Sequence, residues 1–273
     1  RAQSISSENL GERIPQPGTH DEIDRMVATL NEMIQRLEQS FAQLEQFTAN
    51  ASHELRTPLT ILKGEIEVAL QQSRNDGEYR SVLESNLEEV RRISRTVEHL
   101  FLLARIDANA ITPVREPVFL KPLLEEIAKD AAILAGEHEV RIESALDDIP
   151  EAQGDTIMLV QLFINLVENG IKYNRPGGSL RLKLTAHGAN AATGYPGIAR
   201  VEVSDTGIGI PHEELDSIFD RFYRVDKQRA RSHGGAGLGL SIAQWIVRMH
   251  KGSINVRSRE GEGTTFTVDI PIE

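Results

Sequence analysis

The chain has 273 residues, a length that predicts one to three domains at roughly 100–200 residues per domain. Its 30 lysines and arginines face 41 acidic residues, and the formal net charge of −11 argues against a nucleic-acid partner, which needs a basic face. The chain lacks cysteine, which excludes disulfides and thiolate metal sites, and no apolar run approaches the ~20 residues of a membrane span.

The first third of the sequence predicts two long helices. Residues 1–20 hold glycines and prolines among polar residues and predict a connector. The first helix is predicted from apolar residues that recur at alternating intervals of four and three, which is typical of a coiled-coil seam: Ile23, Val27, Leu30, Ile34, Leu37, Phe41 and Leu44. A polar turn follows at residues 73–77, and a second helix is predicted from about Glu78 to Asp107.

These helices predict a hairpin with an exposed apolar stripe. Two copies of the chain can bury that stripe in a dimeric four-helix bundle, so we expect a homodimer. The alternative is a monomeric hairpin that packs on the second domain.

From about Pro113 the pattern changes to short alternating strands separated by helices, which predicts an α/β sandwich. The domain boundary is expected near residues 108–116, and residues 188–197 are expected to form a hairpin loop. Strands are predicted near residues 140–143, 180–184, 200–203, 254–257 and 265–270, and helices near 120–135, 155–172, 211–219 and 237–250.

His53 is the first residue whose position predicts chemistry. It lies two residues after Ala51, which continues the seam, so His53 falls on the outermost face of the helix. Glu54 is adjacent and can orient the imidazole or take a proton, and Thr57 follows one turn later on the same face. Pro58 then removes a backbone donor. An exposed neutral imidazole in this setting can act as a nucleophile, whereas the plain alternative is a surface histidine.

Three glycine-rich segments, at residues 205–210, 235–240 and 261–266, predict a ligand site in the α/β domain. Each also fits an ordinary tight turn, but together they supply backbone that can approach a ligand closely. The second segment precedes a helix, whose free N–H groups attract phosphate. No Gly-Lys-Ser/Thr follows, so none is a P-loop, and the spacing does not match a dinucleotide fingerprint.

Asn165 and Asn169, with Lys172 or Tyr173, lie one turn apart on one face of a predicted helix. Two carboxamides on an otherwise apolar helix are costly unless they find partners. Their oxygens suit a hard cation such as Mg²⁺, which keeps few protein ligands beside substrate phosphates. The alternative interpretation is a pair of surface amides.

Six motifs, in this order, resemble those of bacterial sensor histidine kinases. They are Ser-His-Glu-Leu-Arg-Thr-Pro at 52–58, Asn-Leu-Val-Glu-Asn-Gly-Ile-Lys-Tyr at 165–173, Asp-Thr-Gly-Ile-Gly-Ile at 205–210, Phe-Asp-Arg-Phe-Tyr-Arg at 219–224, Gly-Gly-Ala-Gly-Leu-Gly-Leu at 234–240 and Gly-Glu-Gly-Thr-Thr-Phe at 261–266. The resemblance covers nearly the whole chain.

The resemblance implies three domains. Residues 1–40 would be part of a HAMP signalling linker, 41–112 a dimerisation and histidine-phosphotransfer domain, and 113–273 a catalytic ATP-binding domain of the gyrase, MutL and Hsp90 type. The chain begins at Arg1 rather than Met, so we expect a fragment of a longer protein. The resemblance implies that this fragment is the cytoplasmic portion of an inner-membrane protein, anchored through segments missing here.

The resemblance also implies catalytic roles. His53 would accept the phosphoryl group of ATP and pass it to an aspartate in the receiver domain of a response regulator. Glu54 would be the acid/base partner, and Thr57 would position a water when the regulator is dephosphorylated. Asn169, with Asn165, would hold Mg²⁺ and the phosphates.

Further contacts to ATP follow from the same resemblance. Lys172 and Tyr173 would touch the phosphate and ribose, and Asp205 would accept a hydrogen bond from the adenine amino group. Arg224 would reach the γ-phosphate from the edge of a lid over residues 225–236, which carries Lys227, Arg229 and Arg231. The remaining contacts would come from Gly207, Gly209, Ile210, Gly235, Gly237, Leu238, Gly239, Leu240 and Thr265.

Three positions depart from the common residues of this family. Gly170 stands where Ala is usual, Asn174 where Ser or Thr is frequent, and Ala236 where Thr is usual. None of them removes a ligand that the resemblance implies, so we expect them to tune nucleotide affinity.

Two other functions stay open. One is an ATP-driven conformational clamp, whose relatives activate water with a glutamate four residues before the metal-binding asparagine. Asn165 occupies that position and cannot take a proton, which favours transfer to a histidine over hydrolysis. The other is a pseudokinase scaffold, and the intact His53, Asn169 and Asp205 argue against it.

Overall fold

The computed structural model describes residues 13–15, 18, 22–71, 75–108, 110–188, 197–225 and 235–272. Most of the expected connector, most of the expected 188–197 loop and the lid residues Lys227, Arg229 and Arg231 lie outside these ranges. The chain divides into two compact units, Arg1–Ile93 and Ser94–Glu273.

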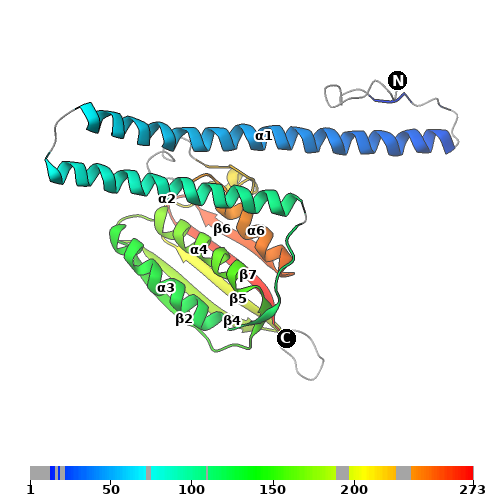
Figure 1. Cartoon of the computed structure of the whole chain (residues 1–273). Coiled ribbons are helices and arrows are strands. Elements are labelled where there is room, and N and C mark those ends of the chain that lie inside the picture. The colour runs from blue at the N-terminus through cyan, green and yellow to red at the C-terminus, as the bar shows by residue number, and fades with distance from the viewer. Residues whose placement is uncertain are drawn as a thin grey trace. The chain divides into compact units, whose positions relative to one another are not determined.

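The first unit is helical, as the coiled-coil spacing predicts. Helix α1 (Glu22–Gln71) runs without a break through Pro58, and helix α2 (Asp76–Asp107) begins in this unit (Figure 1). Within this unit, two seam residues, Val27 and Ile34, are buried in the single chain. The later seam residues are exposed: Leu37, Phe41 and Leu44.

The second unit is built on a mixed sheet with the strand order β1-β3-β7-β5-β4-β2, and β6 pairs with β7. Strands β2 and β4 pair in parallel, and the other described pairs are antiparallel. The strands are β1 (Glu116–Val118), β2 (Arg141–Leu146), β3 (Ala152–Gly154), β4 (Ser179–His187), β5 (Gly197–Asp205), β6 (Ser253–Arg259) and β7 (Gly263–Ile272).

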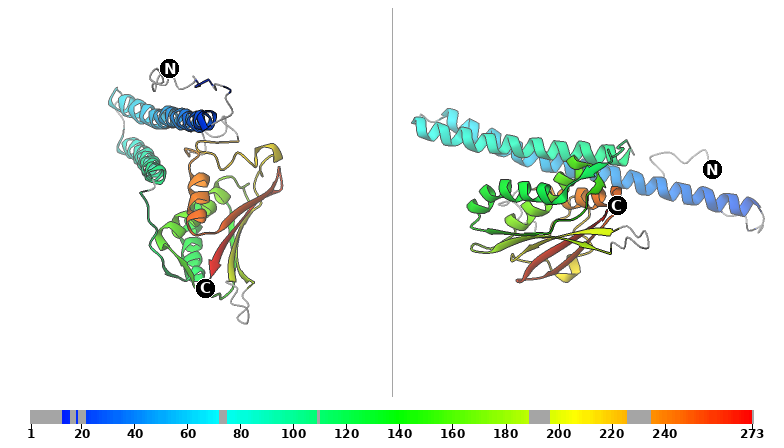
Figure 2. Two further views of the ribbon diagram at one scale, coloured as in Figure 1. Left: turned by 90° about the vertical axis from the view of Figure 1, so that its right-hand side faces the viewer. Right: turned by 90° about the horizontal axis from the view of Figure 1, so that it is seen from below.

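Helices α3 (Leu120–Glu137), α4 (Thr156–Lys172) and α6 (Gly239–Met249) lie on one face of this sheet (Figures 1 and 2). The strands alternate accordingly. In β4, Leu180, Leu182 and Leu184 are fully buried under the helices, whereas Arg181 and Lys183 on the other face are exposed. The prediction of a helical hairpin followed by an α/β sandwich is confirmed.

The predicted helix at residues 211–219 is wrong. Only a short 3₁₀ turn, η1 (His212–Glu214), forms there, and turns follow it. The N–H of Ser217 donates to the carbonyl of Glu214 at 3.0 Å, an i to i+3 bond. So short a segment does not repay the cost of nucleating an α-helix.

Strands β1 and β3 were not predicted, because three residues are too few to show alternation. None of the described helices combines the length and the apolar character that crossing a membrane requires.

Candidate functional site

The first candidate group lies on α1 in the helical unit. His53 is exposed, as its seam position predicts, and Glu54 beside it is half-buried. The hydroxyl of Thr57 donates to the carbonyl of His53 at 3.3 Å, which confirms that the two residues are one turn apart. The group therefore presents an accessible imidazole next to a carboxylate.

Helix α4 carries the second group in the other unit. Its first turn is capped by Asp155, which accepts a hydrogen bond from the N–H of Met158 at 3.1 Å. The N–H of Asp155 donates in turn to Nε2 of the buried His250 at 2.9 Å. This cap holds the start of a helix whose apolar face is buried under the sheet.

The two asparagines of α4 differ in their surroundings. Asn165 is buried, donates to the carbonyl of Gly239 at 3.2 Å and accepts from Nε2 of Gln161 at 3.1 Å. Asn169, one turn later, is half-buried, and its side-chain amide has no partner among the described residues. Asn165 therefore fastens α4 to α6, and Asn169 offers an oxygen to a ligand. Their joint role as metal ligands stays a prediction.

The glycine-rich segment at residues 235–240 faces this side of α4. A Cβ added to Gly235 would lie 3.0 Å from Nζ of Lys172, and that ammonium lies 5.7 Å from the ring centre of Tyr173. Leu238 is buried, Leu240 is half-buried, and α6 begins at Gly239. The N-terminus of α6 thus lies beside the polar face of α4, a combination that suits phosphate.

The motif at residues 219–224 joins the same region through backbone. The N–H of Phe222 donates to the carbonyl of Gly237 at 2.9 Å. Phe222 has a φ of 63°, an uncommon conformation for a bulky residue, and the φ of Gly237 is 67°. Arg224, which follows, is half-buried.

Asp205 ends β5 and is the third group. Its Oδ1 accepts hydrogen bonds from the N–H groups of Gly207 at 2.8 Å and Thr264 at 3.2 Å. Burial raises the pKa of Asp205 above its ordinary value of 3.8, and these two hydrogen bonds oppose the rise. A side chain on Gly207 would clash with the carbonyl oxygen of Tyr173, so the chain approaches α4 closely at this point.

The other predicted residues of this loop are held from the β6–β7 hairpin. Gly209 has a φ of 68° and lies against the backbone of Arg259, and the N–H of Ile210 donates to the hydroxyl of Ser258 at 2.8 Å. Thr265 donates its hydroxyl to Ser204 at 3.0 Å. Thr264, whose N–H donates to Asp205, was not among the predicted residues, although it lies in the third glycine-rich segment.

The structure therefore brings together four segments far apart in sequence, at residues 165–173, 205–210, 235–239 and 261–265. It combines the half-buried carboxylate of Asp205, the cationic side chain of Lys172, the Asn169 amide, which has no partner among the described residues, and close backbone N–H groups. This arrangement can recognise a base at one end and phosphates with a divalent cation at the other.

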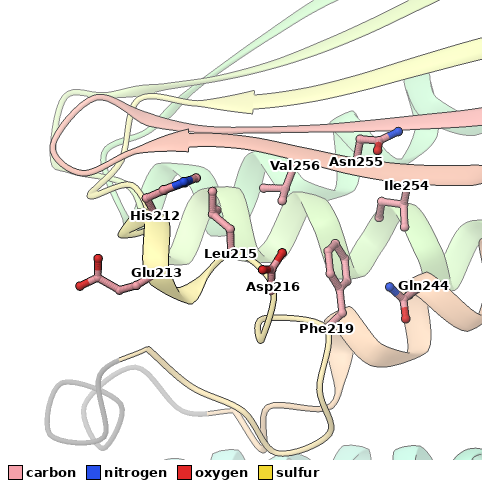
Figure 3. Close-up of a pocket in the computed structure, with 9 residues that line it drawn as sticks. All are labelled: His212, Glu213, Leu215, Asp216, Phe219, Gln244, Ile254, Asn255 and Val256. Carbon is pink, nitrogen blue, oxygen red and sulfur yellow. The ribbon is translucent and has the colours of Figure 1, made fainter.

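A separate hollow of about 580 Å³ lies between η1, α6 and β6 (Figure 3). Its apolar lining includes Phe219, whose ring meets Phe266 edge-on with ring centres 6.5 Å apart. Glu213, Asp216 and Asn255 contribute polar groups. None of the predicted site residues lines it, so it is not the site described above.

Comparisons with known families match this organisation in chain order. Residues 1–39 match the HAMP domain, and residues 43–109 match the His Kinase A (phospho-acceptor) domain. Residues 154–273 match the histidine kinase-, DNA gyrase B- and HSP90-like ATPase family. The fold and the matches define a phosphoacceptor helix pair joined to an ATPase-type domain.

Individual histidine kinases and sensor proteins are also similar to this chain. The sensor protein IrlS of Burkholderia pseudomallei is 36% identical over 99% of this chain, and the chain spans 56% of its length. The full-length structure of ShkA in complex with AMPPNP is 26% identical, with a TM-score of 0.59 over 83% of this chain and 45% of that one. The structure of the histidine kinase ThkA in complex with the response regulator TrrA shares the fold, with 22% identity and a TM-score of 0.64 over 86% of this chain and 64% of that one.

The chain belongs to the sensor histidine kinases of two-component systems, which are protein-histidine kinases.

Proposed function

We propose that this chain transfers the γ-phosphoryl group of ATP to His53 and then to an aspartate in a response regulator. The observation that carries the proposal is the exposed imidazole of His53 beside Glu54 in a chain that also holds a nucleotide-type site around Asp205. In the transfer, a ring nitrogen of His53 attacks the γ-phosphorus, the bond to the β-phosphate oxygen breaks, and ADP leaves. Glu54 accepts the imidazole proton.

The residues of the second unit fit ATP and Mg²⁺. The half-buried amide of Asn169, which has no partner in the described part of the chain, carries an oxygen of the kind that Mg²⁺ takes as a ligand, and the ammonium of Lys172 lies near Gly235. Mg²⁺ would neutralise charge on the phosphates, while Asp205 orients the base and Arg224 stabilises the transferred group. Phosphoryl transfer depends mainly on such positioning and charge stabilisation.

The carboxamide of Asn165 favours phosphoryl transfer to a histidine over the hydrolysis of ATP by a conformational clamp. A clamp needs a base at this position to activate water, and a carboxamide cannot take the proton. The Asn165 amide is also engaged by Gly239 and Gln161. Transfer to an external nucleophile such as His53 needs no base there.

We further propose that the chain acts as a homodimer. Several large apolar side chains of α1 and α2 are exposed in the single helical unit, among them Leu59, Leu83 and Val90. A second copy can cover this apolar stripe and remove it from water.

The partner and the cellular setting complete the proposal. A receiver domain is the expected acceptor, since the similar kinase ThkA is recorded in complex with a response regulator. Thr57, on the same exposed face as His53, would assist dephosphorylation of the regulator. The HAMP match at residues 1–39 supports a membrane-anchored receptor with this portion in the cytoplasm.

Incubation with γ-labelled ATP and Mg²⁺, followed by acid and alkali treatment, tests the proposal. We expect label that is lost in acid and retained in alkali, as a phosphoramidate requires. His53→Gln should bind ATP and take up no label, whereas the control His187→Gln, at an exposed histidine of the other unit, should label normally. Normal labelling of His53→Gln would overturn the assignment.

A further inference from the structure

Asn174 lies two residues beyond the end of α4, and its side chain uses all of its hydrogen-bonding capacity. Its Nδ2 donates to the carbonyls of Gly170 and Ser179, both at 3.0 Å. Its Oδ1 accepts from the N–H of Arg175 at 3.0 Å and from the hydroxyl of Thr206 at 3.2 Å. An amide can donate two hydrogen bonds and accept two, so this half-buried group is saturated by protein.

These partners belong to the elements that form the two ends of the proposed ATP site. Gly170 follows Asn169 in the last turn of α4, and Thr206 follows Asp205 at the end of β5. Ser179 begins β4 between them, and its N–H donates to the Thr206 hydroxyl at 2.9 Å. The Asn174 side chain therefore connects the helix that carries Asn169 to the loop that begins with the half-buried carboxylate of Asp205.

The surrounding backbone leaves room for this amide. A Cβ on Gly178 would clash with Oδ1 of Asn174 and lie 2.8 Å from the Thr206 hydroxyl. A serine or threonine at position 174, which is frequent in the family, has a single hydroxyl proton. Such a residue could not donate to both the α4 carbonyl and the β4 carbonyl, so the asparagine makes a bridge that the shorter side chains cannot complete.

We propose that Asn174 is a positioning residue for ATP, which holds the phosphate-binding face of α4 in register with the adenine-binding loop. This inference rests on the proposed ATP site. All four hydrogen bonds of the Asn174 side-chain amide are made to protein, so its effect on ATP would act through the groups that it holds. Its effect is on the geometry between the two half-sites: a ligand that spans both gains from their fixed separation, whereas a ligand that uses one half does not.

The test compares a ligand that spans the site with one that fills the adenine end. Affinities for Mg²⁺–AMPPNP and for adenosine are measured on the whole chain, for wild type, Asn174→Ala and Asn174→Ser. Thr206→Val removes the hydroxyl that bonds to Asn174 while nearly keeping the side-chain shape. If Asn174→Ala does not fold, the same two affinities are measured on Thr206→Val. Asn255→Ala, at an exposed residue of β6, is the matched control.

For Asn174→Ala we expect the AMPPNP affinity to fall about tenfold, the scale of one or two neutral hydrogen bonds, and the adenosine affinity to stay within about twofold. Asn174→Ser should recover part of the loss, because one of the bridging bonds can form. In autophosphorylation assays the KM for ATP should rise more than kcat falls. Asn255→Ala should match wild type throughout.

A parallel loss of AMPPNP and adenosine binding, together with a lower unfolding temperature, would show that Asn174 only supports the fold and would overturn the inference. Unchanged affinity for both ligands would overturn it as well. If wild type does not bind AMPPNP more tightly than adenosine, the proposed ATP site itself fails, and that result is distinct from either outcome for the variants.

Discussion

Asp205→Asn should weaken ATP binding by about 10–150-fold. Both backbone donors, the N–H groups of Gly207 and Thr264, bond to Oδ1 of Asp205, and Oδ2 has no partner within the described residues. We assign Oδ2 to the adenine amino group. An asparagine can still accept from the backbone, but it then presents its own NH₂ donor to that amino group. Losing one charge-assisted hydrogen bond costs about 1.5–3 kcal/mol, which sets the expected range.

The same substitution should stabilise the ligand-free domain near neutral pH. Burial raises the pKa of Asp205 above its ordinary value of 3.8, so the folded chain holds this proton more tightly than the unfolded chain. As the pH rises through the unfolded pKa, ionisation of Asp205 begins to destabilise the fold, and the full penalty applies above the folded pKa. A neutral asparagine removes that penalty. For the same reason, ATP affinity of the wild type should fall on acidification before an ordinary carboxyl group protonates.

Titration calorimetry with Mg²⁺–ATP and Mg²⁺–GTP, together with thermal unfolding of the ligand-free protein, measures both effects. Asp148→Asn is the control, because that exposed carboxylate pairs with Lys121 on the surface. Wild type should prefer ATP, since guanine presents a carbonyl where adenine has its amino group. Equal affinity for the two nucleotides, or a parallel loss of affinity and stability in Asp205→Asn, would refute the reasoning.

Three further predictions follow from the described contacts. Thr57→Ala should leave autophosphorylation within a few-fold of wild type and slow regulator dephosphorylation by about 10²–10⁴-fold, and a parallel fall in both rates would argue against a separate role. Gly207→Ala should lower the free energy of unfolding by about 1–3 kcal/mol through its backbone clash, whereas Gly136→Ala, in open space on a helix, should not lower it. Val90→Glu should weaken dimerisation at least about tenfold in sedimentation experiments, while Glu88→Gln should leave it unchanged.

Much of the fold could be predicted because burial imposes a period on the sequence. The alternation of Leu180, Leu182 and Leu184 with charged residues gives a strand directly, and the 4-3 spacing of the seam gives α1. The segment at residues 211–219 misled the prediction because an apolar spacing of three or four also fits consecutive turns. Burial sets the period, but the hydrogen-bond pattern of a short segment depends on what it packs against.

The motifs of the candidate site could be predicted from the sequence, but the hydrogen bonds that connect them could not. Asn165 and Asn169 look equivalent on a helical wheel, yet the Asn165 amide donates to Gly239, whereas the Asn169 amide has no hydrogen-bond partner within the described ranges. That difference arises from α6, whose starting residue is 74 positions away from Asn165. Likewise Asn174 looks like a minor departure from the family until its bonds to Ser179 and Thr206 are seen.

Glycine shows most clearly why sequence motifs underdetermine a site. A side chain on Gly136 would meet no atom within 4 Å, whereas a side chain on Gly207 would clash with the backbone of Tyr173, the residue after the end of α4. Gly170 is a third case, since a Cβ there would press on the flexible end of Leu180, which can give way. An alanine is therefore tolerable at position 170, where the family usually has it, and not at position 207. The close approach at Gly207 brings the loop after β5 against Tyr173 at the end of α4, so the requirement for glycine there follows from the geometry of the candidate site.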